Sequence, residues 1–169
     1  MAADGSIRKH FEAALGLLDA GNWLAANEEL EKVPADVRIA PDVLVLRCRI
    51  LAMAGRWADV ELIAQTASMT YRDNFRFYTH WAWALHRQGR TADGLEVVAS
   101  VAERFPKSGA TAYAIACLNG ALGRSAEAQH WLVEAFQRHE TDALKEKALK
   151  QPELACVWQE LRKEQATGE

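Results

Sequence analysis

Cysteines and histidines are the residues of this 169-residue chain that could do redox, metal or nucleophilic chemistry. The three cysteines, Cys48, Cys117 and Cys156, have no second cysteine or histidine at the spacing of a metal or redox motif. His80 and His86 are six residues apart, which places them on different faces of a helix and disfavours a shared metal. We therefore expect no metal and no cofactor. Cys117 is a minor candidate for a reactive thiol, against the more ordinary interpretation of a packed side chain.

The sequence offers equally little for acid–base or phosphate chemistry. Glu28 and Glu29 fall where a helix surface is expected, and His130 with Glu134, four residues apart, fits an ordinary surface pair. The sequence has neither a glycine-rich phosphate loop nor a nucleophile elbow. We predict that the protein is not an enzyme.

One cluster of aromatic and basic residues suits binding better than catalysis. Trp81 and Trp83 lie two residues apart, about 200° around a helix, so they cannot both face the same core. On one stripe with Trp83 lie Arg76, Thr79, His86 and Arg87. Because aromatic rings provide contact area and arginine grips carboxylates, this stripe would suit an acidic, partly apolar peptide. The alternative is that Trp83 packs under a neighbouring helix or stacks on Arg87.

A repeat in the sequence indicates the elements that position these residues. Glycines recur at Gly21, Gly55, Gly89 and Gly123, each 34 residues after the one before. Seven residues before each glycine stands a small side chain: Ala14, Cys48, Ala82 and Ala116. Apolar residues recur at helical spacing on both sides of every glycine. The pattern predicts antiparallel helix pairs, with each glycine in left-handed backbone between its two helices.

Charge and hydropathy narrow the class of protein further. With 23 acidic and 20 basic side chains and a formal net charge of −3, we expect no nucleic-acid partner. The most apolar window, residues 43–53, contains Arg47 and Arg49 and is shorter than the roughly 20 residues of a membrane span, so we expect no membrane association. The first ten residues lack the apolar stretch of a secretory signal, and the odd number of cysteines fits a reducing compartment. We expect a cytoplasmic protein.

Three phrases around the repeated glycines resemble a known family. They are Ala54-Gly55-Arg56-Trp57-Ala58-Asp59-Val60, Gln88-Gly89-Arg90-Thr91-Ala92-Asp93-Gly94 and Leu122-Gly123-Arg124-Ser125-Ala126-Glu127-Ala128. With their period of 34 residues, they resemble the tetratricopeptide repeat family. Three residues depart from the family's pattern: Arg47 stands where the family has a buried leucine, Gly94 stands where it has an alanine, and Pro34 shortens the second helix of the first unit.

The resemblance implies an all-α fold, a right-handed α-solenoid of antiparallel helix pairs. We expect a single domain over residues 1–169, built from four units and a C-terminal capping pair of helices. The units would span residues 7–40, 41–74, 75–108 and 109–142, and the capping helices residues 143–165. A capping pair is needed because the last repeat has no neighbour to cover its apolar face.

The resemblance also implies a function. In the family, the first helices of the pairs line a concave groove that binds a segment of another protein. Carried onto this chain, the groove residues are Arg49, Met53, Arg76, Thr79, Trp83, His86, Arg87, Tyr113 and Cys117. We expect a non-catalytic, monomeric adaptor or scaffold with a protein or peptide partner. Whether a partner or the chain's own terminus fills the groove is left open. The alternative is a dedicated chaperone for a secreted or aggregation-prone client, dimeric through its N-terminal helix.

Overall fold

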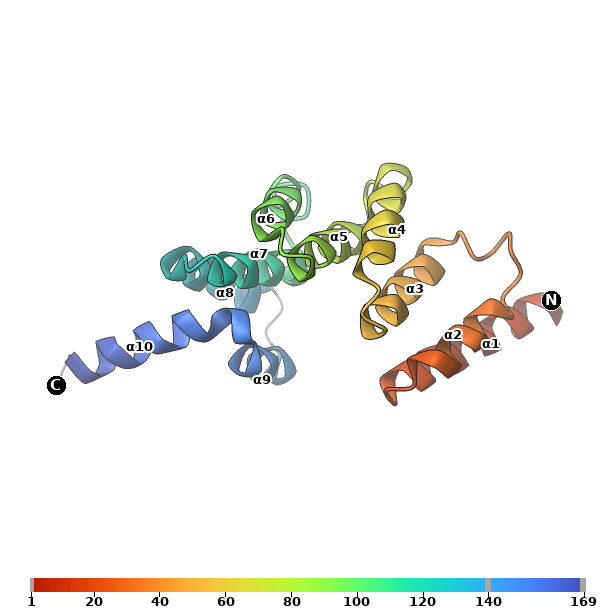
Figure 1. Cartoon of the computed structure of the whole chain (residues 1–169), viewed down its shortest axis with the longest axis horizontal. Helices are drawn as coiled ribbons and strands as arrows, with labels where there is room; N and C mark the ends of the chain where they lie inside the picture. Colours follow the sequence, from red (N-terminus) through yellow and green to blue (C-terminus); the bar gives the residue numbers. More distant parts are fainter. Residues whose placement is uncertain (1, 139–140, 168–169) are drawn as a thin grey trace. The chain divides into compact units, whose positions relative to one another are not determined.

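A computed structural model describes residues 2–138 and 141–167, and the regular structure within these ranges is helical (Figure 1). In chain order the elements are α1 (Ala2–Asp19), α2 (Trp23–Glu31), α3 (Pro41–Met53), α4 (Trp57–Thr70), α5 (Phe75–Arg87), α6 (Thr91–Ala99), α7 (Gly109–Ala121), α8 (Ser125–Arg138), α9 (Asp142–Lys150), the 3-10 turn η1 (Pro152–Leu154) and α10 (Ala155–Thr167). This confirms the predicted all-α class.

The chain divides into two compact units, and the boundary falls inside α5, between Ala84 and Leu85. The first unit holds α1 to α4 and most of α5. The second holds the end of α5 and the elements from α6 to α10. The single domain over residues 1–169 stays a prediction.

The four repeated glycines end the first helix of each pair, as the sequence predicts. Their φ angles are 82°, 73°, 81° and 74° at Gly21, Gly55, Gly89 and Gly123. The amide that follows each glycine donates to the carbonyl five residues earlier in the chain, and the distance is 2.9 Å in all four cases. This is the Schellman arrangement, in which a left-handed glycine lets the backbone satisfy carbonyls that the helix end leaves without partners.

Packing inside each unit explains the small residues that recur in the sequence. The residues seven before each glycine, Ala14, Cys48, Ala82 and Ala116, are all fully buried. In the first unit α1 packs on α2 and α3 on α4, and in the second unit α7 packs on α8. Because two helix backbones approach closely at these positions, a larger side chain would push the helices apart. The helices thus form sequential antiparallel pairs.

Arg47, which departs from the family's pattern, reaches from α3 to the end of α2. Its guanidinium donates to a carboxylate oxygen of Glu31 at 2.7 Å, and Arg38 contacts the other oxygen. The hydrogen bond from Arg47 holds the pKa of Glu31 below its usual range, against the opposing effect of burial. An arginine is tolerated at this position because its charged end leaves the core and finds a partner at the surface.

Candidate functional site

Two adjoining hollows lie on the first unit, on what we call the first-helix face: the side formed by α1, α3 and residues 75–84 of α5. The smaller has a volume of about 270 Å³ and is lined by Phe11, Leu15, Val45, Asp42, Arg49 and Arg76. The larger has a volume of about 540 Å³ and is lined by Leu18, Asp19, Arg49, Met53, His80 and, from the start of α4, Trp57. Arg49 borders both hollows, so they meet at its side chain.

Ion pairs between successive first helices cross this face. Arg49 on α3 donates to Asp19 on α1 at 2.9 Å, and Arg76 on α5 donates to Asp42 on α3 at 2.6 Å. Both pairs are exposed, since each arginine side chain is more than two fifths accessible. Exposed pairs of this kind contribute about 0–1 kcal/mol each. The arginines that the sequence singles out are thus partnered, but by groups that an incoming carboxylate could replace.

The remaining predicted groove residues of the first unit differ in the solvent exposure of their side chains. Met53 is 49% exposed at the edge of the larger hollow. Thr79 and Trp83 are half-buried, and the Thr79 hydroxyl donates to the carbonyl of Arg76 at 2.9 Å. Burial, together with the charges of Arg49 and Arg76, lowers the pKa of the nearby His80 to about 4, so its ring is neutral near pH 7. The positive charge of this face therefore comes from its arginines.

In the second unit, α7 is covered on every side. Each residue from 111 to 120 is buried, including two predicted groove residues, Tyr113 at 4% exposure and Cys117 at 0%. A helix without charged residues that is buried all round lies inside a protein rather than on its surface. The chain's own C-terminal elements contribute to this cover, since η1 and α10 both pack on α7. Tyr113 and Cys117 thus lie under the chain itself.

The segment from Gln151 to Leu154 contacts α7 and the end of α5 within the second unit. Glu153 approaches His86 with 3.1 Å between a carboxylate oxygen and Nε2. The Tyr113 hydroxyl donates to the side-chain oxygen of Gln151 at 3.5 Å. Two predicted groove residues, His86 and Tyr113, therefore contact a segment of this chain. Arg87, at the end of α5, is exposed.

The buried cysteines are poor nucleophiles. Burial raises the pKa of Cys117 to about 12; the charge of Glu153 adds to this effect, and a hydrogen bond with Tyr113 opposes it. Burial likewise raises the pKa of Cys48 to about 12. Because the thiolate is the reactive form, neither side chain is activated at neutral pH. Across residues 2–138 and 141–167, no three histidine, cysteine or acidic side chains come together where they could hold a metal ion.

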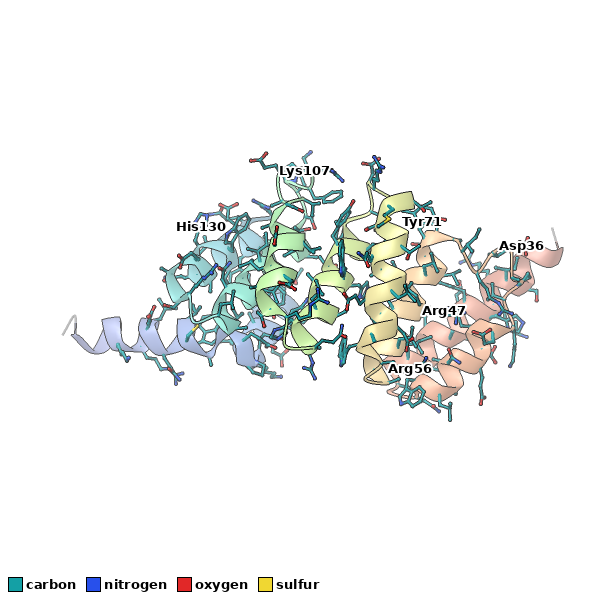
Figure 2. The ribbon with its side chains drawn as sticks, turned by 45° about the horizontal axis from the view of Figure 1, so that its top comes forward. Asp36, Arg47, Arg56, Tyr71, Lys107 and His130 are labelled. Atoms are coloured by element: carbon teal, nitrogen blue, oxygen red, sulfur yellow. The ribbon has the colours of Figure 1, made fainter. Side chains whose placement is uncertain are left out.

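A third hollow, which was not predicted from the sequence, lies between α4 and the segment that contains the end of the connection before α3 and the start of α3. It has a volume of about 430 Å³, and its lining is mostly apolar, with Ile39, Leu44, Leu62, Ile63 and Tyr71 as the large side chains. Tyr71 stands at the C-terminal end of α4, opposite Arg56 at its start (Figure 2). Leu62 and Ile39 are about two-thirds exposed. A leucine and an isoleucine that face solvent could have indicated this hollow from the sequence. The signal is weak, because single exposed apolar residues are common on protein surfaces.

The helix arrangement is similar to that of a solved tetratricopeptide repeat protein, MamA MSR-1 C2. The match has a TM-score of 0.58 and covers 79% of this chain and 77% of the other, at 17% sequence identity. The chain has the tetratricopeptide repeat fold. No protein-family model matches the sequence, and the comparison with curated proteins finds no match. At this level of identity the likeness establishes the fold alone.

The tetratricopeptide repeat fold accommodates the second departure from the family's pattern. At Gly94, where the family has alanine, the residue is buried near the start of α6. A helix-interior glycine in place of alanine costs about 1 kcal/mol of helix stability, so the substitution weakens this unit without changing its fold.

Within the described part of the chain, no helix has the length and apolar character needed to cross a membrane.

Proposed function

We propose that the protein is a non-catalytic adaptor that holds a segment of a partner protein against its first-helix face. The observation that carries this proposal is the pair of hollows, of about 270 and 540 Å³, which meet at Arg49. Together they offer a larger open surface than either alone, and their lining combines apolar side chains with a few charged groups. Such a mixture is typical of surfaces that recognise a peptide through apolar anchors and a small number of polar contacts.

The charges on this face favour a partner segment that is acidic and partly apolar. Arg49 pairs with the exposed Asp19, and Arg76 pairs with the exposed Asp42 and also donates to the side-chain oxygen of Asn74 at 3.2 Å. A carboxylate from the partner can replace either aspartate at a cost of about 1 kcal/mol or less, because exposed pairs are weak. An apolar side chain of the partner would then cover Met53, which is half exposed when the face is open.

Site-specific photo-crosslinking tests this proposal. A photoreactive amino acid replaces Met53 in one protein and Met69 in another, and both are irradiated in native lysate. Met69 is the matched control, because it is also an exposed methionine, at 63% against 49%, but lies on α4 outside both hollows. We expect a defined partner to crosslink from position 53 and not from position 69.

Three results would count against the adaptor. Crosslinks from position 69 alone would move the binding surface away from the first-helix face. Equal crosslinking from both positions would indicate unspecific contact. Recovery of one unfolded client, together with a dimeric chain by light scattering, would favour the chaperone instead.

A further inference from the structure

The segment Gln151–Leu154 lies on α7 in the way that a bound peptide lies on a receptor. Its backbone approaches α7 closely at Gly120, where an added Cβ atom would come within 2.0 Å of the carbonyl oxygen of Glu153. The side chain of Leu154 is fully buried. The thiol of Cys156, just beyond the segment, donates to the Gly120 carbonyl at 3.6 Å. Only a glycine at position 120 leaves room for this approach.

Polar contacts add specificity for the glutamate. The carboxylate of Glu153 faces Nε2 of His86, and the other ring nitrogen of His86 faces the hydroxyl of Thr91 at 3.0 Å. If Thr91 donates to Nδ1, then Nε2 carries the hydrogen and donates to Glu153, so the ring has a partner on both sides. The side-chain amide of Gln151 donates to the second carboxylate oxygen of Glu153. The carboxylate of Glu153 is thus contacted by the side chains of His86 and Gln151.

The elements on either side of the segment bury few apolar side chains. On α9, which precedes it, Ala148 is the buried residue, and the remaining side chains are exposed or half-buried. The described part of α10, which follows, buries Val157, and its half-buried Trp158 donates to the carbonyl of Ala148 at 3.1 Å. Elements with few buried apolar contacts open at a lower free-energy cost than a protein core. Opening this region therefore has to break the contacts of Glu153, Leu154 and Val157.

We propose that the inner face of α7, together with His86, is a peptide site for a glutamate–leucine pair, with the chain's own Gln151–Leu154 segment as resident ligand. A partner protein carrying the same pair in a short exposed segment displaces it. The contacts that hold the segment are the burial of Leu154, an imidazole opposite a carboxylate and a glycine against the backbone, and none of them requires that the ligand belong to the same chain. All of these groups lie in the second unit, so the proposal stands independently of the first-helix face.

A peptide added to test this proposal has to compete with the resident segment for the same site. A tethered ligand acts at an effective concentration of about 1 mM, so a free peptide binds measurably only when the tethered copy is weakened. The probe is a fluorescein-labelled peptide with the sequence of residues 150–157, with serine in place of Cys156. Its binding is measured by fluorescence anisotropy against the full chain and against the full-chain variant Leu154→Ala, which weakens the resident segment and leaves the receptor residues intact.

We expect the peptide to bind Leu154→Ala at least about tenfold more tightly than wild type. Adding Gly120→Ala to that variant should abolish the gain, because the new methyl group occupies the place of the peptide backbone. Alkylation of Cys117 should rise in Leu154→Ala and fall again when peptide is added, since the peptide restores the cover. If circular dichroism shows that Leu154→Ala has lost its helices, Glu153→Ala replaces it, because that change removes the contact with His86 and leaves the leucine in place.

Several outcomes would overturn the proposal. They are equal affinity for wild type and weakened variant, no binding to either, and binding that survives Gly120→Ala. A wild-type chain that elutes as a dimer with exchanged segments would assign the site to a second copy and would equally overturn displacement by a partner.

Discussion

Gly120→Ala is expected to destabilise the protein, although the same change in most helices is stabilising. Replacing a helix-interior glycine by alanine gains about 0.8–1 kcal/mol of helix stability. At Gly120 the new Cβ would lie 2.0 Å from the Glu153 carbonyl oxygen and 3.0 Å from its carbonyl carbon. Because both atoms are backbone, neither can rotate away, and the segment must move off α7 by more than 1 Å.

The cost of that movement follows from what the segment buries. Leu154 is fully buried, and exposing a leucine costs about 1.5–3 kcal/mol. The half-buried contact between Glu153 and His86 adds about 0.5–1 kcal/mol. After subtraction of the gain in helix propensity, we expect Gly120→Ala to lower the free energy of unfolding by about 1–3 kcal/mol.

Gly16→Ala is the matched control for this variant. Gly16 lies inside α1, is exposed and has no heavy atom of a neighbour within 4 Å of its Cβ position. We therefore expect Gly16→Ala to raise the free energy of unfolding by about 0.5–1 kcal/mol. Urea unfolding followed by circular dichroism measures both variants. The reasoning would be refuted if Gly120→Ala were as stabilising as Gly16→Ala and Cys117 stayed protected from alkylation.

Three further predictions follow from burial and charge. The pKa of His80 is about 4 in the folded chain against about 6.5 when unfolded, so below pH 6.5 the unfolded state binds a proton that the folded state does not. Stability should fall as the pH drops from 6.5 to 4, and His80→Gln should flatten this part of the profile in pH-dependent urea melts. With iodoacetamide at neutral pH, the partly exposed Cys156 should react before Cys48 and Cys117, as peptide mapping would reveal; faster labelling of Cys117 would contradict its burial. Phe77→Ala should cost about 3–5 kcal/mol in the same melts, since Phe77 is fully buried, and a cost under about 1 kcal/mol would contradict that packing.

The helix pairs could be predicted from the sequence because they depend on local signals. The turn after each first helix needs one residue in left-handed backbone, which glycine adopts without steric cost, and a small residue seven positions earlier marks the contact between paired helices. The ion pair between Asp42 and Arg76 could also have been predicted from the sequence, because the two residues lie 34 positions apart, which is one repeat, on adjacent first helices. Their pairing follows from the repeat once the helices are stacked.

The docking of Gln151–Leu154 could not be predicted in the same way, because it depends on contacts distant in the chain. Glu153 meets His86 across 67 positions, and no periodic pattern links the two. One local signal was present: residues 109–121 contain no charged side chain, which is unusual for a helix with an open face. That signal predicts a covered helix, although it does not identify what covers it.

We propose above that the first-helix face binds the partner. A comparison of two arginine variants tests this most directly. Arg49→Glu reverses the charge where the two hollows meet, next to Asp19. Arg56→Glu makes the same change at the start of α4, next to Asp59, where the arginine is also exposed. Affinity for the partner identified by crosslinking is measured for both proteins by isothermal titration calorimetry. We predict a loss of about tenfold or more for Arg49→Glu and less than about twofold for Arg56→Glu. Equal affinities for the two variants would contradict the claim.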